Sequence, residues 1–179
     1  VQQANVKGSA AISETLSQYS ALMVMKQRYD PAMMRKFLKY ELDSYLQGRS
    51  SETKKENPLA EVAGQSYIHY RKGSVVMYAL QDYVGEDSIN QALARFVDKW
   101  GFREGLYPTT EDLIAELRAV TPDSLQYLIT DMWETITLYE NRTKKATYEK
   151  VSADEYRVDL ELSTVKYRAD SLGNETPIE

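Results

Sequence analysis

The chain contains no cysteine and only one histidine among its 179 residues, and these two shortages limit its chemistry. Without cysteine it can form neither disulfide bonds nor thiolate–metal sites. A single histidine, His69, cannot provide the two imidazoles of an H-E-x-x-H zinc motif. We also find no serine that could form a catalytic triad with His69, and no glycine-rich phosphate-binding loop.

Long apolar runs and tracts of positive charge are missing as well. The longest apolar runs, residues 21–25 and 75–80, are far shorter than the ~20 residues that a membrane-spanning helix needs. The net charge is −5, and no basic tract stands out, which argues against a nucleic-acid partner. Charged residues make up 27% of the chain, so we expect this fragment to be soluble. No signal peptide is visible.

The apolar residues that are present recur at three- and four-residue spacing along most of residues 1–140, which predicts a mainly α fold with six helices. Asp30-Pro31 and Thr121-Pro122 each combine a capping residue with a proline that suits a first helical turn. Thr109 and Thr110 precede two acidic residues and predict the start of the fifth helix. Three glycines are expected to end helices: Gly48, Gly85 and Gly101.

Two details of the helical part bear on the site. The second helix, residues 31–47, is expected to bury one apolar stripe, formed by Met34, Leu38, Leu42 and Tyr45. Residues 49–65 are polar and lack periodicity, which predicts a long loop before the third helix, residues 66–84. Loops of this length are often functional or mobile.

After residue 138 the period of the pattern changes. Apolar and charged residues alternate strictly from Tyr156 to Leu162, which predicts a half-buried strand. Residues 146–151 and 155–165 should form a hairpin. Because two strands alone are marginally stable, the hairpin should belong to a larger sheet or pack on the helices. We place the domain boundary at about residue 140, with residues 1–140 in one domain and 141–179 in the next.

Glu14 is a candidate metal ligand. It lies early in the first helix, beside small residues that would let another helix come close. A zinc peptidase needs three protein ligands and an open fourth position, and the third ligand is often a glutamate on a later helix. The alternative is a first-turn glutamate that the helix dipole favours.

Tyr70 is a candidate hydrogen-bond donor to the oxyanion that forms during peptide hydrolysis. A neutral phenol can donate this bond without neutralising the charge of a metal. Gly73, on the same helical face, would make room for substrate or for a neighbouring backbone. The alternative is that Tyr70 is one core tyrosine among 14. We interpret His69 as structural or as lining a cleft.

These motifs resemble the aminopeptidase N-like family of zinc metallopeptidases, which are of the gluzincin type. Residues 13–19 (SETLSQY) stand where the family has N-E-G-F-A-x-Y, so Glu14 and Tyr19 match, whereas Ser13 and Thr15 replace asparagine and glycine. Residues 70–73 (YRKG) match the family's Y-x-K-G motif fully. Longer stretches, such as YIHYRKGSVVMYAL, are similar to bacterial members that are linked to transporter permeases, and the resemblance covers nearly the whole chain.

The resemblance implies a fold, a metal and two roles. The first 140 residues would be the helical part of a thermolysin-like catalytic domain, and the hairpin would begin a β-sandwich. Glu14 would be the third zinc ligand and Tyr70 the transition-state stabiliser. H-E-x-x-H, with the general base, would lie upstream of Val1, so we expect this fragment to bind no zinc and to be inactive.

Two functions remain open at this point, and a third interpretation is a helical domain whose motifs match the family by coincidence. The first is a zinc-dependent aminopeptidase that hydrolyses N-terminal peptide bonds. The second is a non-catalytic, peptidase-like interaction module of a membrane-transporter complex. The parent would then be membrane-associated, and an extracytoplasmic location follows only from the subgroup. The partners expected are a peptide substrate, transporter segments of the parent and a second copy that could bind through exposed apolar surface.

Overall fold

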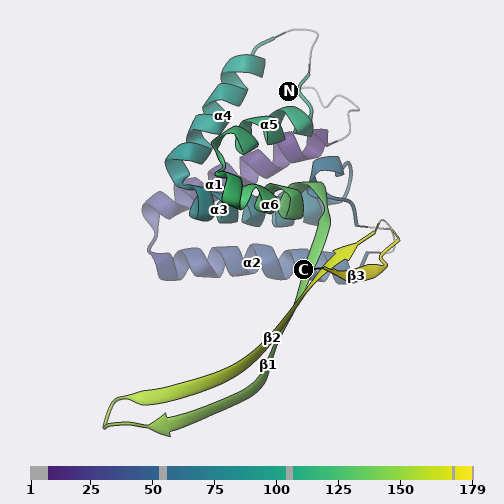
Figure 1. The fold of residues 1–179 in the computed structure, drawn as a ribbon. Helices are drawn as coiled ribbons and strands as arrows, with labels where there is room; N and C mark the ends of the chain where they lie inside the picture. Colours follow the sequence, from purple (N-terminus) through teal and green to yellow (C-terminus); the bar gives the residue numbers. More distant parts are fainter. Residues whose placement is uncertain (1–7, 53–55, 104–106, 171, 179) are drawn as a thin grey trace. The chain divides into compact units, whose positions relative to one another are not determined.

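A computed structural model of the chain describes residues 8–52, 56–103, 107–170 and 172–178. The chain divides into two compact units, Val1–Thr135 and Ile136–Glu179. The described part of the first unit is helical, and that of the second is an antiparallel sheet (Figure 1). The prediction of a mainly α fold with six helices followed by β structure is confirmed at this level. No helix within the described ranges is both long enough and apolar enough to cross a membrane.

The helical unit combines six α-helices with short π- and 3-10-helical turns in its described residues. The α-helices are α1 (Leu16–Arg28), α2 (Pro31–Ser50), α3 (Gly73–Val84), α4 (Glu86–Trp100), α5 (Thr110–Val120) and α6 (Gln126–Ile129). The π-helical turns are η1 (Ala11–Thr15), η3 (Tyr67–Lys72) and η5 (Thr130–Glu134), and the 3-10 turns are η2 (Leu59–Glu61) and η4 (Asp123–Leu125). η1 leads into α1, and η3 leads into α3, so each pair forms one continuous helix.

The predicted helix starts are confirmed where a side chain caps the backbone. The carboxylate of Asp30 accepts a hydrogen bond of 2.8 Å from the N–H of Met33, and Pro31 occupies the first turn of α2. The N–H of Thr109 donates to the carboxylate of Asp112 at 2.9 Å, which completes a capping box at the start of α5. These short-range contacts need no tertiary partner, and this is why the sequence predicts them well.

The predicted end of α2 at Gly48 is wrong, because the helix continues to Ser50. Gly48 serves a different purpose, since a Cβ at this position would lie only 2.4 Å from the Cβ of Tyr67. The missing side chain lets Tyr67 lie directly on α2, where its ring stacks on that of Tyr45 with the centroids 6.1 Å apart. A close approach of this kind is the second common reason for a glycine in a helix.

The predicted apolar stripe of α2 is wrong at one residue. Leu42 is 43% exposed, whereas Glu41 is only 4% exposed and faces the bundle beside Met34 and Tyr45. A buried carboxylate is tolerated only when it is paired, and Arg71 supplies the pair to Glu41. A charged residue therefore occupies a place in the stripe that periodicity assigns to leucine.

The predicted loop between α2 and η3 holds two core residues. Leu59 and Val62 have no exposed area, and Leu59 begins the 3-10 turn η2. Two isolated anchors produce no periodic pattern, so they could not be recognised from the spacing. The described part of this loop is therefore packed into the helical unit.

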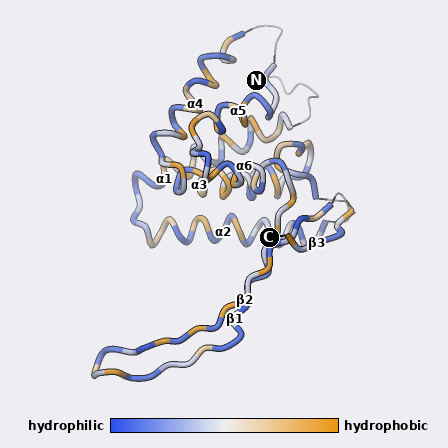
Figure 2. The backbone as a smooth tube through the Cα atoms, viewed as in Figure 1, coloured by the Kyte–Doolittle hydropathy of each residue, from blue (hydrophilic) through white to orange (hydrophobic). Residues whose placement is uncertain are grey.

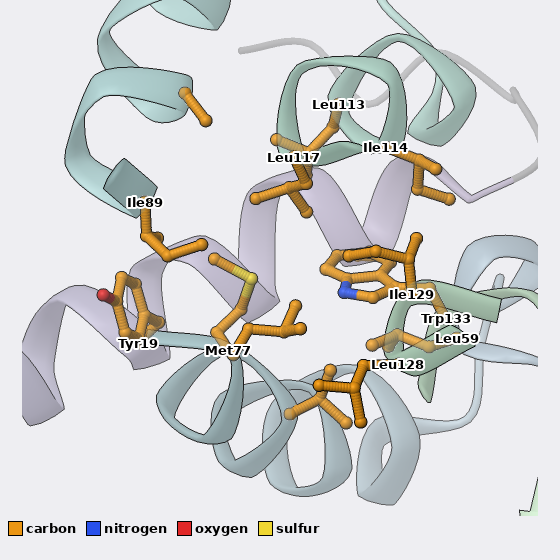
Figure 3. Close-up of a cluster of buried hydrophobic side chains, with 14 of the residues drawn as sticks. Tyr19, Leu59, Met77, Ile89, Leu113, Ile114, Leu117, Leu128, Ile129 and Trp133 are labelled. Carbon is orange, nitrogen blue, oxygen red and sulfur yellow. The ribbon is translucent and has the colours of Figure 1, made fainter. Parts of the chain in front are cut away.

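The core of the helical unit lies between α3, α4, α5 and the last helical segment, which consists of α6 and η5. Figure 3 shows the side chains of these elements pointing toward one another. Trp133 has no exposed area despite its size, and the same is true of Met77 and Leu117. Aliphatic residues of α4, α5 and α6 complete the cluster: Ile89, Leu113 and Ile129. Burial of this apolar surface is the main force that holds the helices together.

The second unit is a three-stranded antiparallel sheet in the order β1-β2-β3. Its strands are β1 (Ile136–Lys150), β2 (Tyr156–Ala169) and β3 (Glu175–Ile178). β1 begins ten residues before the predicted start at residue 146. It pairs with β2 from Ile136↔Ala169 to Lys150↔Tyr156, with an irregularity between Thr143 and Lys145.

The prediction that the alternating strand is half-buried is wrong. All four of its apolar residues are more than half exposed: Tyr156, Val158, Leu160 and Leu162. Val158 pairs with Tyr148, which is also exposed, and the alternation along β2 places the apolar side chains on one face of the hairpin. Figure 2 shows hydrophobic and hydrophilic stretches alternating along the backbone of this hairpin. β3 pairs only with Lys166–Ala169, at the other end of β2, and covers none of this face.

Candidate functional site

The two residues predicted to carry chemistry lie on two π-helical turns. Glu14 belongs to η1, Tyr70 belongs to η3, and these turns pack against each other. A π-helical turn places one extra residue in a helix and is found often at functional sites. Periodicity does not reveal such a turn, because one extra residue shifts the apolar pattern only slightly.

The side chains of Glu14 and Tyr70 meet. A hydrogen bond from the phenol of Tyr70 to the carboxylate of Glu14 raises the pKa of Tyr70 above its usual value of 10, and burial and the charge of Glu14 act in the same direction. Both residues are partly exposed, so the pair is accessible from solvent. The structure thus brings the two candidates together, while their roles as metal ligand and oxyanion donor stay predictions.

The carboxylate of Glu14 differs from those of its acidic neighbours. Within the described ranges Glu14 forms no ion pair with lysine or arginine. By contrast, Glu41 lies 2.9 Å from Arg71, and Glu56 lies 2.9 Å from Lys72. Among the described residues, therefore, no lysine or arginine neutralises the charge of Glu14, and a cation could bind it.

His69 lies next to this pair and is buried, with 8% of its surface exposed. Its ring meets the ring of Tyr70 edge-on, with the centroids 4.7 Å apart. Burial lowers the pKa of His69 below 6.5, and the charge of Glu14 opposes this effect only in part, so the imidazole is neutral at pH 7. Its Nδ1 atom has no hydrogen-bond partner in the part of the chain that the structure describes.

Two ion pairs hold η3 against α2 and the loop that follows. Arg71 binds both carboxylate oxygens of Glu41, at 3.0 and 2.9 Å. The ammonium of Lys72 binds Glu56 at 2.9 Å, and the hydroxyl of Tyr45 donates to the same carboxylate at 2.9 Å. Burial alone would raise the pKa of Glu56, but Lys72 and the hydrogen bonds outweigh it, so this pKa falls below its usual value. The middle residues of Y-R-K-G thus fix the turn that carries Tyr70.

Gly73 leaves room for a neighbouring helical turn and none for a substrate, so only the second of its two expected uses fits the structure. A Cβ at Gly73 would lie 2.2 Å from Oγ1 of Thr15, so the side chain of Thr15 fills this place. The hydroxyl of Thr15 donates a buried hydrogen bond of 2.5 Å to the carbonyl of His69. The room that the glycine provides is therefore used for contact between the two turns.

Tyr19, the other residue that matches the third-ligand motif, lies in the core and outside the site. It is 2% exposed, and its hydroxyl donates to Oε1 of Gln81 at 3.1 Å. Burial, together with the charge of Glu86, raises the pKa of Tyr19 to about 12. Tyr19 thus joins α1 to α3 and holds in place the helix that follows Glu14.

The described residues do not contain a complete metal site. Among them there is no group of three or more histidine, aspartate or glutamate side chains that could hold a metal ion. Glu14 alone offers one oxygen ligand in the right chemical class for zinc. Two further ligands would have to come from elsewhere.

A separate hollow lies between η2 and α5. It has a volume of about 560 Å³, and its polar lining includes Thr109, Arg118 and Glu134. Arg118 and Glu134 form an ion pair of 2.7 Å, so these two charges already compensate each other. Neither Glu14 nor Tyr70 lines this hollow, and it is therefore not part of the candidate site.

Comparison of the chain with protein-family models, curated proteins and solved structures produced no match. The resemblance to the aminopeptidase N-like family therefore rests on residues 13–19 and 70–73 and on the longer similar stretches.

Proposed function

We propose that this chain is part of a zinc-dependent aminopeptidase in which Glu14 is the third metal ligand and Tyr70 donates a hydrogen bond to the oxyanion. One observation supports this proposal above all others. Two motifs separated by more than 50 residues in sequence bring the phenol of Tyr70 into contact with the carboxylate of Glu14 on adjoining π-helical turns, and this carboxylate forms no ion pair within the described ranges.

Glu14 fits one position of such a metal site. Its carboxylate is partly exposed and lacks a basic partner within the described ranges, as a metal-binding oxygen should before it binds. The other two ligands would be the histidines of an H-E-x-x-H motif upstream of Val1, whose glutamate would be the general base. Zinc, when bound, would polarise the substrate carbonyl and lower the pKa of a bound water.

Tyr70 fits the role of a neutral donor. Its raised pKa keeps the phenol protonated at and above neutral pH, so the hydroxyl always carries the proton that it donates. The neutral imidazole of His69 adds no positive charge that would compete with a metal at Glu14. The ion pairs of Arg71 and Lys72 hold η3, and therefore Tyr70, against the rest of the helical unit.

The chain by itself should be inactive under this proposal. One carboxylate ligand of three cannot hold zinc tightly, and the general base is missing. We therefore expect no stoichiometric zinc in the dialysed 179-residue chain and no hydrolysis of aminoacyl or peptide substrates. One tightly bound zinc ion per chain in metal analysis would contradict this.

The alternative is a peptidase-like interaction module of a membrane-transporter complex. The replacement of the motif's asparagine and glycine by Ser13 and Thr15 favours this alternative. The residues that precede Val1 in the gene discriminate between the two functions. An intact H-E-x-x-H supports the enzyme, and its loss supports the interaction module.

The decisive test uses the protein that this proposal implies, in which H-E-x-x-H precedes the present sequence. Tyr70→Phe should retain bound zinc but lower kcat by about 100- to 1,000-fold, because it removes one oxyanion donor. Glu14→Ala should lose zinc on dialysis and should lose activity with it. Full activity of Tyr70→Phe, or full zinc content of Glu14→Ala, would refute the assigned roles.

Matched controls separate these roles from the structural alternatives. Glu111→Ala removes another acidic side chain from a first helical turn and should change neither zinc content nor kcat. Tyr83→Phe removes the hydroxyl of an exposed tyrosine on α3 and should be neutral in the same assays.

A further inference from the structure

The contact between the two π-helical turns depends on one buried hydroxyl. Thr15 directly follows Glu14, and its side chain has no exposed area. Its Oγ1 donates to the carbonyl oxygen of His69, the residue directly before Tyr70, at 2.5 Å. A single hydrogen bond thus joins the neighbour of one candidate residue to the neighbour of the other.

Gly73 makes this bond possible. A Cβ at position 73 would lie 2.2 Å from Oγ1 of Thr15 and 2.7 Å from its Cγ2. Both distances are too short for any real contact, so a side chain at position 73 would displace the threonine. Thr15 and Gly73 therefore form a matched pair across the two helices, and the motif Y-R-K-G contributes one half of it.

We propose that Thr15 is a positioning residue of the candidate site: its hydroxyl holds η1 against η3 at the separation at which Glu14 and Tyr70 meet. This role rests on the proposed function, because only a site that needs both groups would require their separation to be set. Thr15 itself has no exposed area, so it cannot touch a ligand from solvent. It acts through the backbone of the residues that flank the pair.

A second threonine–glycine pair of the same kind joins α5 to the residues that precede η1. The hydroxyl of Thr110 donates to the carbonyl of Ala60 at 2.6 Å, and a Cβ at Gly8 would lie 2.4 Å from Oγ1 of Thr110. Thr110 is also buried, with 3% of its surface exposed. Thr110→Val therefore removes a comparable hydrogen bond without touching Glu14 or Tyr70.

The test follows the contact between Tyr70 and Glu14 in the 179-residue chain by NMR, through nuclear Overhauser effects between the ring protons of Tyr70 and the side-chain protons of Glu14. Tyr70→Phe and Glu14→Gln assign the two sets of signals. Wild-type protein should show these effects, because the two side chains meet. Thr15→Val should weaken or abolish them, because the two turns are no longer held together.

Rescue and control variants decide whether the effect is one of position. Thr15→Ser keeps the hydroxyl and should behave as wild type, and Thr110→Val should lower the melting temperature but keep the Tyr70–Glu14 contact. If Thr15→Val keeps this contact at full strength, or if Thr110→Val weakens it equally, Thr15 is not a positioning residue. If Thr15→Val does not fold, Thr15→Ala supplies the same measurement, since it removes the hydroxyl and adds no volume.

This experiment is independent of the zinc and peptidase assays. It needs neither metal nor substrate, so a negative result refutes the positioning role and leaves the proposed aminopeptidase open. Failure of the longer protein to bind zinc would refute the aminopeptidase, while loss of the Tyr70–Glu14 contact in Thr15→Val would still show that Thr15 sets the geometry of the pair.

Discussion

The helical unit and the β unit are both built from elements with one apolar and one polar face, but the apolar faces are buried in the first and exposed in the second. In the helical unit the apolar faces meet, and residues such as Leu117 and Trp133 have no exposed area. In the β unit the apolar face of the hairpin is open, and Leu160 is 56% exposed. A sequence pattern therefore specifies which face of an element is apolar, but it does not specify whether another element covers that face.

The two units should differ most in the stability that is lost when an ion pair is broken. Glu56→Ala should destabilise the helical unit by about 3–5 kcal/mol, because it leaves the nearly buried ammonium of Lys72 without its partner. Glu149→Ala removes the partner of Arg157 on the hairpin, where both side chains are 64% exposed, and should cost less than about 1 kcal/mol. Urea unfolding, followed by circular dichroism for the helices and by amide NMR signals for the hairpin, measures both. Equal losses of stability in the two variants would contradict this difference between the units.

Replacement of a leucine by alanine should cost far more stability in the helical unit than in the β unit. Leu117→Ala removes a fully buried side chain and should cost about 3 kcal/mol, from lost burial and from the cavity that remains. Leu160→Ala lies on the open face of the hairpin and should change stability by about 0.5 kcal/mol or less. The same unfolding measurements apply. A large cost for Leu160→Ala would mean that its face is covered in solution, for example by a second copy of the chain.

The two units should differ least in how their stability depends on pH. Burial lowers the pKa of His69, so below pH 6.5 the unfolded chain binds a proton that the folded chain resists. The stability of the helical unit should therefore fall as the pH decreases from 6.5 toward the folded pKa, by at most about 1.4 kcal/mol per pH unit.

His69→Gln should remove this dependence between pH 7 and pH 5. The β unit has no histidine, so its stability, followed by its amide NMR signals, should stay constant over the same interval. A wild-type helical unit whose stability is flat from pH 7 to pH 5 would show that the imidazole is not shielded from water as its burial indicates.

Sequence reasoning works well here for contacts that are local. The caps at Asp30 and Thr109 and the helix end at Gly85 depend on neighbours within a few residues, and the structure confirms all three. The motif residues Glu14 and Tyr70 were found because residues 13–19 and 70–73 resemble two motifs of a known family, and the structure brings them into contact.

The same reasoning fails where the decisive neighbour is distant in sequence. Glu41 occupies an apolar stripe because Arg71, 30 residues away, neutralises it. Gly48 lies inside a helix because Tyr67 packs on it. One signal for Glu41 was available: the spacing of Met34, Leu38 and Tyr45 places position 41 on the same face as well as position 42, so a charged residue there could have been questioned.

The order of amino acids by itself determined the helical periodicity, the caps, the amphipathic hairpin and the absence of a histidine pair, because each depends on residue type and short-range spacing. Only the tertiary structure decided that Thr15 enters the space left by Gly73, that Glu14 and Tyr70 share a hydrogen bond and that the apolar face of the hairpin is uncovered. The physical reason is that burial, close packing and pKa depend on which surfaces meet in space, and no single segment of the chain carries that information.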